Sequence, residues 1–101
     1  MQVNTVNNSG VVDLKLTGRF DFNSHRDFRG AYEPLIADAQ VRAINVDMAA
    51  VEYLDSSALG MLLMLRDKTS AAGKGLALVN ARGAVRQVLD IANFGKLFKI
   101  D

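Results

Sequence analysis

The chain is short of the residues that build most reactive or covalently stabilised sites. Its 101 residues include no cysteine, no tryptophan and one histidine, His25. The absence of cysteine excludes disulfides and thiolate chemistry, and a single histidine leaves no convincing ligand set for a transition metal. A serine-hydrolase triad is not indicated either, because no Gly-x-Ser-x-Gly turn occurs and nothing places His25 within reach of a serine. We therefore expect no metal and no cofactor.

Charge of a single sign and long apolar runs are also lacking. The chain has 12 basic and 11 acidic residues and a net charge of +1, whereas a dedicated nucleic-acid binder usually has a strongly basic face. No apolar run approaches the length that spans a bilayer, and residues 1–4 lack the basic and apolar blocks of a signal peptide. We expect a cytoplasmic protein that neither binds nucleic acid nor inserts directly into a membrane.

Hydrophobic residues make up 50% of the chain, which is enough for the core of one domain spanning residues 1–101. Their spacing separates strands from helices. Val12, Leu14 and Leu16 alternate with polar residues, which predicts a strand that has one buried face and ends at Gly18. The predicted elements are strands at residues 1–6, 11–17, 43–48 and 76–79, helices from Asn23 or Ser24 to Ala39, from Ser56 to Ala72 and at residues 84–92, and a short last strand at residues 97–100. This order, β-β-α-β-α-β-α-(β), predicts an α/β fold with helices packed on a mixed β-sheet.

One proline interrupts the helical spacing of the first predicted helix. Pro34 cannot donate a hydrogen bond to the carbonyl of Gly30, and its ring crowds the preceding turn. We therefore expect a kink or a broken turn at this point of the helix.

The stretch around which the chain is organised lies at residues 51–65, where a strand turns into a helix. Asp55 and Ser56 stand at the turn, and side-chain oxygens of Asp and Ser accept the unpaired backbone N–H bonds at a helix start. A hydroxyl at that corner lies over the positive end of the helix dipole, where a phosphate group is favourably placed. The residues alone are also compatible with a plain helix cap, which is the commoner role of such a pair.

The helix that follows has two different faces. On a helical wheel of about 100° per residue, one face should meet the sheet and the other should point outward. The inward face holds Ala58, Leu62, Leu65 and Thr69; the outward face holds Ser56, Gly60, Met64, Asp67 and Ala71, with Ser57 and Leu63 beside it. The outward face is small and partly apolar, which suits a surface that packs against a partner. A core stripe that is simply wider than usual explains the same residues.

Three motifs resemble those of the STAS domain family, the bacterial anti-sigma factor antagonists, and they follow one another along the chain in the family's order. Leu54-Asp55-Ser56-Ser57-Ala58-Leu59-Gly60 resembles the phosphorylation motif of the family, although Ala58 stands where glycine is usual. Residues 16–21, Leu-Thr-Gly-Arg-Phe-Asp, resemble the end of the family's second strand. Residues 94–100, Phe-Gly-Lys-Leu-Phe-Lys-Ile, resemble its C-terminal signature. The resemblance covers nearly the whole chain.

The resemblance implies a protein switch, a substrate of enzymes and not an enzyme. Ser56 corresponds to the residue that a serine kinase of the anti-sigma type phosphorylates. The unmodified form would bind an anti-sigma factor or such a kinase, and a PP2C-type phosphatase would reverse the modification. The loop that contains Asp21 lies beside this serine in the family and contributes an acidic contact. The predicted partner-binding residues are Asp21, Asp55, Ser57, Gly60, Leu63 and Met64.

The Phe20-Asp21-Phe22 loop and the short C-terminal end are similar to a branch of the family that acts in response-regulator pathways, which control motility and biofilm formation. In that branch the phosphatase is part of a response regulator. Two other functions stay open. One is a STAS subunit of a membrane transport complex, in which the same helix docks permanently. The other is a module that binds a nucleotide or a lipid near the motif.

Overall fold

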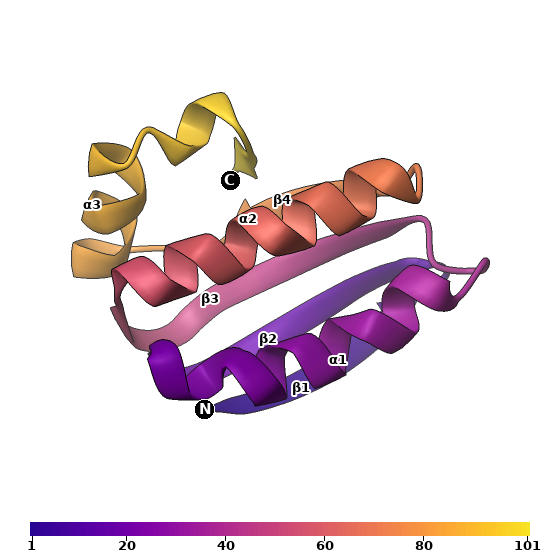
Figure 1. Cartoon of the computed structure of the whole chain (residues 1–101), viewed down its shortest axis with the longest axis horizontal. Coiled ribbons are helices and arrows are strands. Elements are labelled where there is room, and N and C mark those ends of the chain that lie inside the picture. The colour runs from indigo at the N-terminus through magenta and orange to yellow at the C-terminus, as the bar shows by residue number, and fades with distance from the viewer.

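The computed structural model describes every residue from Met1 to Asp101. Strands and helices follow one another in the predicted order (Figure 1). The strands are β1 (Gln2–Asn8), β2 (Val11–Phe20), β3 (Ala43–Leu54), β4 (Gly75–Val79) and β5 (Lys99–Ile100), the helices are α1 (His25–Ala37), α2 (Ser56–Ala71) and α3 (Gly83–Ile91), and two short 3-10 turns are η1 (Phe22–Ser24) and η2 (Phe94–Lys96). The prediction of an α/β fold with a mixed sheet is confirmed.

The five strands form one sheet in the order β1-β2-β3-β4-β5. Strands β1 and β2 are antiparallel and are joined by the two-residue turn Ser9-Gly10, in which both φ angles are positive (55° and 93°). A two-residue turn with positive φ at both positions is favoured in hairpins, because its twist matches that of the two strands. The pairs β2–β3, β3–β4 and β4–β5 are parallel.

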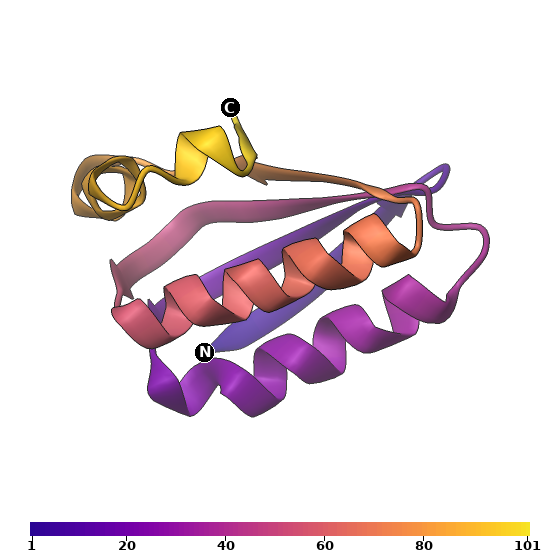
Figure 2. The same cartoon turned by 45° about the horizontal axis from the view of Figure 1, so that its top comes forward.

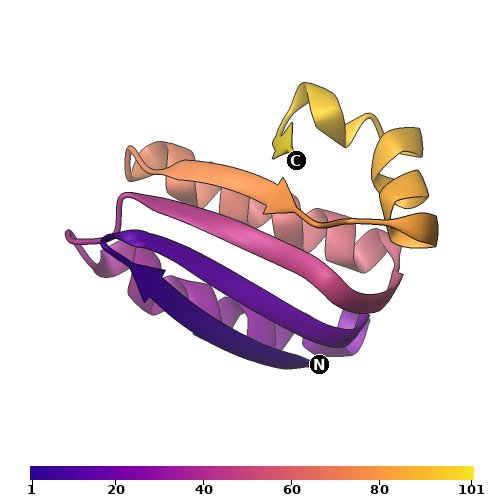
Figure 3. The same cartoon turned by 180° about the vertical axis from the view of Figure 1, so that it is seen from behind.

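Helices α1 and α2 lie side by side on one face of the sheet and form the core with it (Figure 2). Ile44, Val46 and Met48 of β3 are almost completely buried on this face, as the alternation predicts. The inward positions of α2 are buried as well: Ala58, Met61, Leu62, Leu65 and Thr69. Seen from behind, the other face of the sheet is not covered by α1 or α2, and α3 packs at the end of β3 (Figure 3).

The first three strands all end later than predicted. Strand β1 continues past residue 6 to Asn8, directly before the turn Ser9-Gly10. Strand β2 continues past Gly18 to Phe20, because Gly18 adopts a φ of 98° at a register shift between the two strands. Strand β3 continues past Met48 to Leu54, through a second irregularity at which the side chain of Asp47 accepts a hydrogen bond from the Ala49 N–H at 3.0 Å. Bulges of this kind redirect a strand without ending it. Strands β2 and β3 therefore finish side by side, at the same end of the sheet.

The first helix also differs from its prediction. A 3-10 turn precedes it, and helix α1 runs from His25 to Ala37, two residues short of Ala39. The helix is not broken at Pro34. Because Pro34 and Gly30 are both exposed, water can satisfy the Gly30 carbonyl that loses its intrahelical partner.

The C-terminal segment is held against α2. The Arg66 guanidinium donates a hydrogen bond from Nε to the Leu97 carbonyl at 2.8 Å. The predicted last strand is present but covers only Lys99 and Ile100, after the turn η2. None of the helices is long and apolar enough to cross a membrane.

Candidate functional site at the start of helix α2

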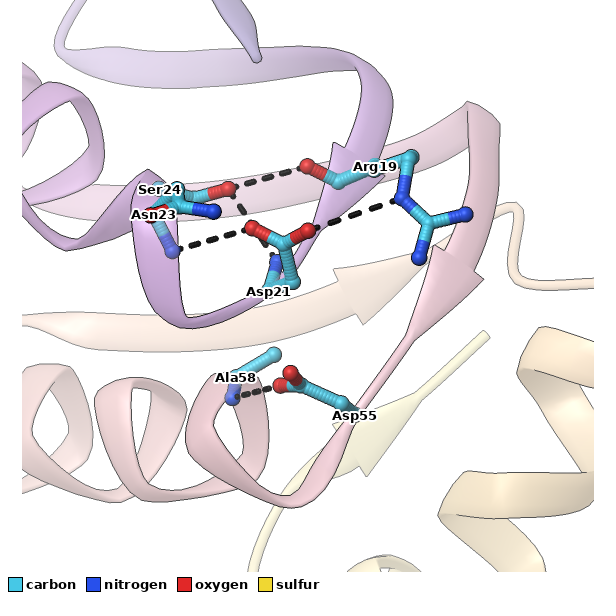
Figure 4. A network of polar contacts seen from close by, with 6 residues as sticks. All are labelled: Arg19, Asp21, Asn23, Ser24, Asp55 and Ala58. Carbon is cyan, nitrogen blue, oxygen red and sulfur yellow. Dashed lines mark hydrogen bonds and ion pairs between the residues drawn. The ribbon is translucent and has the colours of Figure 1, made fainter.

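The corner between β3 and α2 is fixed by Asp55. Its backbone is extended, and its side chain accepts a hydrogen bond from the Ala58 N–H at 2.9 Å, which makes Asp55 the N-cap of α2 (Figure 4). The Asp55 N–H donates to the Phe20 carbonyl at 3.3 Å. The start of α2 is therefore tied to the end of β2, and Asp55 has the capping role that the sequence indicates.

Ser56 is the first residue of α2 and its side chain is exposed, whereas Ser57 is half-buried. The backbone N–H groups of Ser56 and Ser57 have no acceptor within the protein. Unpaired N–H groups and the helix dipole give the start of a helix a partial positive charge. The position of Ser56 thus combines an accessible hydroxyl with backbone groups that can stabilise a phosphate.

Asp21 is held in place beside this corner by the turn η1. Its carboxylate accepts a hydrogen bond from the Asn23 N–H at 3.0 Å. Its own N–H donates to the Ser24 hydroxyl at 3.1 Å, and that hydroxyl donates to the Arg19 carbonyl at 2.9 Å. Asp21 and Ser24 form a capping box at the start of η1. Ser24 occupies the N-cap position of α1, as one of the two predicted alternatives, but its side chain makes no capping hydrogen bond to α1.

Arg19 adds a positive charge that the sequence did not predict for this site. Its Nε lies 3.5 Å from Oδ2 of Asp21 (Figure 4). Its guanidinium carbon lies 4.1 Å from the centre of the Tyr53 ring. Arg19 and Tyr53 are partners in the parallel register of β2 and β3. That register depends on a shift between Gly18 and Arg19, opposite which β3 has one extra residue, Glu52. The sequence does not reveal this shift, so only the structure brings Arg19 and Tyr53 together.

The structure therefore brings part of the predicted set of site residues together at the carboxyl ends of β2 and β3. Asp21 follows Phe20 and Asp55 follows Leu54, and Phe20 and Leu54 are partners in neighbouring parallel strands. The two carboxylates and Ser56 lie at this end of the sheet. Phe22, a neighbour of Asp21, lies there as well, and its side chain is 74% exposed.

The other predicted residues lie further along α2. Gly60 is exposed, and a Cβ atom added to it would meet no atom within 4 Å. Met64 is 45% exposed. Leu63 is only half-buried and packs against the core. The outward face of α2 is thus open at Gly60 and Met64, and Leu63 belongs partly to the core.

A shallow hollow lies between α1 and α2, and its empty space of ≈ 150 Å³ includes open solvent. Its lining residues are His25, Phe28, Arg29, Tyr32, Met61 and Met64. Burial raises the pKa of the Tyr32 hydroxyl; the nearby Arg29 charge opposes this rise and Glu33 adds to it.

The geometry defines a class: a small α/β domain with an exposed serine at a capped strand-to-helix corner. A family model described as "Mlab, STAS domain" matches residues 3–99. A STAS-domain-containing protein of Pseudomonas aeruginosa (strain UCBPP-PA14) is 47% identical over 87 residues, which are 86% of this chain and 84% of that protein. The chain belongs to the STAS domain family.

Further relatives are anti-sigma factor antagonists. The anti-sigma F factor antagonist of Paenibacillus polymyxa is 23% identical over 100 residues, which are 99% of this chain and 86% of that protein. The anti-sigma factor antagonist SpoIIAA in its unphosphorylated form has the same fold, with a TM-score of 0.81 at 20% identity over 98% of this chain and 87% of that one. The phosphorylated form of the Bacillus protein SpoIIAA gives a TM-score of 0.75 at 19% identity over 98% and 90% of the two chains. The chain thus has the STAS fold of anti-sigma factor antagonists.

Proposed function

We propose that this chain is an anti-sigma factor antagonist that works as a phosphorylation-controlled binding switch, and that it is not itself an enzyme. The observation that carries the proposal is the Ser56 side chain, which is exposed at the first position of α2 beside two unpaired backbone N–H groups. This is a position that a kinase can reach and at which a phosphate is stabilised by the helix start.

Phosphorylation of Ser56 adds a charge of about −1.5 to −2 and three acceptor oxygens. The N–H groups of Ser56 and Ser57 are free to bind some of these oxygens, so the domain need not refold. The same fold occurs in both the unphosphorylated and the phosphorylated forms of SpoIIAA, which supports a switch that acts at the surface.

The surface around Ser56 is where we place the partner. Gly60 and Met64 form a small, partly apolar strip on α2. Asp21 and Phe22 border this strip just after the end of β2. A partner seated there would lose contact when a bulky, charged phosphate appears at Ser56. By analogy with the anti-sigma F factor antagonist, which is 23% identical, the unmodified chain binds an anti-sigma factor or a serine kinase of that type.

For the rest of the cycle we propose what the resemblance of the sequence motifs to the family implies. The kinase phosphorylates Ser56, and a PP2C-type phosphatase, part of a response regulator in pathways that control motility and biofilm formation, removes the phosphate. The two alternatives have less support. The hollow between α1 and α2 encloses no space for even a water molecule, whereas small-ligand sites are clefts of roughly 300–1,000 Å³. Permanent docking in a transport complex would not need an exposed hydroxyl at Ser56.

The test is affinity capture from native cell extract, followed by mass spectrometry. The baits are the wild type, Ser56→Ala, Ser56→Asp and Ser70→Asp. Ser70 is an exposed serine near the other end of α2, so Ser70→Asp adds the same charge away from the site. We expect Ser56→Asp alone to lose the main partner. Equal recovery by all four baits would show that Ser56 does not control binding and would favour a permanent subunit.

A further inference from the structure

The two edges of the sheet are built very differently. Strand β5 forms one edge and has only two residues, with Lys99 paired to Asp101 at 3.8 Å. Strand β1 forms the other edge and has seven residues, Gln-Val-Asn-Thr-Val-Asn-Asn, in continuous register with β2. Short length, charge, proline and bulges are the usual protections of an edge strand. Strand β5 has the first two, and β1 has none of the four.

The outer side of β1 offers unpaired backbone groups. The Ser9-Gly10 turn closes on the pair Asn8–Val11, and in such a hairpin this closing pair is hydrogen-bonded. Hydrogen-bonded and non-hydrogen-bonded pairs alternate along an antiparallel ladder. The N–H and C=O groups of Val3, Thr5 and Asn7 therefore point away from β2, and no strand lies on that side (Figure 3).

We propose that β1 is a self-association edge, which pairs antiparallel with β1 of a second copy about a twofold axis at Thr5. In that register Thr5 lies opposite Thr5, and Val3 lies opposite Asn7 of the other copy. Asn4 then lies opposite Val6, which is 40% exposed. All three outward residues find partners, and no like charges face each other across the seam, because β1 contains no charged residue.

A second copy fits this edge better than an unrelated peptide. Proteins that bind an extended peptide at a sheet edge select it through pockets for alternate side chains. The hollow of this chain lies between α1 and α2, away from β1. The edge offers backbone groups, mostly polar side chains and two valines, Val3 and Val6, with no pocket among its residues. It therefore has little basis for choosing a foreign sequence, whereas the twofold register is complementary to itself.

The proposed pairing is weak and leaves both switch sites open. A stable interface buries about 1,200–2,000 Å², more than one seven-residue edge supplies, so the dimer exchanges with monomer. The twofold axis at Thr5 sends the two copies' Ser56 sites to opposite ends of the joined sheet. Self-association would therefore make the chain bivalent for its partner without covering the site.

Sedimentation equilibrium of the full chain from micromolar to millimolar concentration tests the proposal. The variants are Thr5→Lys and the matched control Thr17→Lys, in which the exposed threonine lies on β2. We expect wild type and Thr17→Lys to dimerise alike, and Thr5→Lys to need at least about fivefold higher concentration, because two lysines face each other at the axis. A wild type that stays monomeric throughout, or variants that associate equally, would overturn the proposal.

Cross-linking gives a second readout that does not depend on the charge change. Because the chain has no cysteine, Thr5→Cys and Thr17→Cys each supply a single thiol. Across the proposed seam the two residue-5 Cα atoms are about 5.5 Å apart, and the two residue-17 atoms about 25 Å apart from strand spacing and rise. A short bismaleimide should link only Thr5→Cys into dimers. Equal linking of both variants would contradict the register.

Discussion

The side chain of Asp55 accepts a hydrogen bond from the backbone N–H of Ala58 at 2.9 Å. This contact leaves the two preceding N–H groups, those of Ser56 and Ser57, without a protein acceptor. Asp55 thus satisfies one of the unpaired donors at the helix start and leaves the others for a ligand or a modification. The switch that we propose depends on this division of the donors.

The cap itself can be tested with two substitutions at one position. Asp55→Ala removes the acceptor and should lower the free energy of unfolding by about 1 kcal/mol. Asp55→Asn keeps an acceptor oxygen and should stay close to the wild type. Urea denaturation measures both values. A similar loss in both variants would mean that the charge, and not the cap, stabilises the start of α2.

The capping role of Asp21 can be separated from the effect of its charge in the same way. Because its side chain accepts from the Asn23 N–H at 3.0 Å, Asp21→Ala should lower stability as well as partner binding. Asp21→Asn keeps an acceptor for that bond and removes the charge, so we expect near-normal stability and weakened binding. The measurement is the melting temperature together with affinity for the captured partner. Unchanged binding by Asp21→Asn would assign Asp21 to the cap alone.

Gly60 allows stability and binding to be changed in opposite directions. An added Cβ atom meets nothing within 4 Å, so Gly60→Ala should stabilise the exposed helix by about 0.5–1 kcal/mol. If the partner packs closely over this strip, the same methyl group should weaken binding. Thermal unfolding and partner capture on one sample measure the two effects. Stronger folding with full binding would place the partner elsewhere.

The raised pKa of Tyr32 predicts that the free energy of unfolding depends on pH in the alkaline range. Burial raises its pKa in the folded state above the ordinary value of about 10. The unfolded chain therefore loses this proton first, so the contribution is present below pH 10 and declines as the pH rises through the folded pKa. Tyr32→Phe should remove this part of the decline in urea denaturation above pH 10. The control is Tyr53→Phe at the other, 42% exposed tyrosine. An equal effect of both substitutions would contradict the assignment.

The order and type of the elements could be predicted because apolar spacing reports burial directly. Val12, Leu14 and Leu16 alternate in the sequence and are buried in the sheet. Ala58, Leu62 and Leu65 have helical spacing and are buried as predicted. These patterns needed no knowledge of which strands are neighbours.

What could not be predicted depends on long-range register. The chain passes Gly18 without leaving the sheet because β3 is available as a partner on the other side of the bulge. The contact of Arg19 with Tyr53 at 4.1 Å follows from that register. The capping box of Asp21 with Ser24 likewise appears only in the structure.

The central claim is that a phosphate on Ser56 decides whether the partner binds. The most direct measurement is titration calorimetry of the captured partner with the unmodified chain and with the chain phosphorylated at Ser56, its site confirmed by mass spectrometry. The account predicts binding to the unmodified chain and an affinity at least about tenfold lower, or about 1.4 kcal/mol, for the phosphorylated one. Equal affinities for the two forms would contradict it.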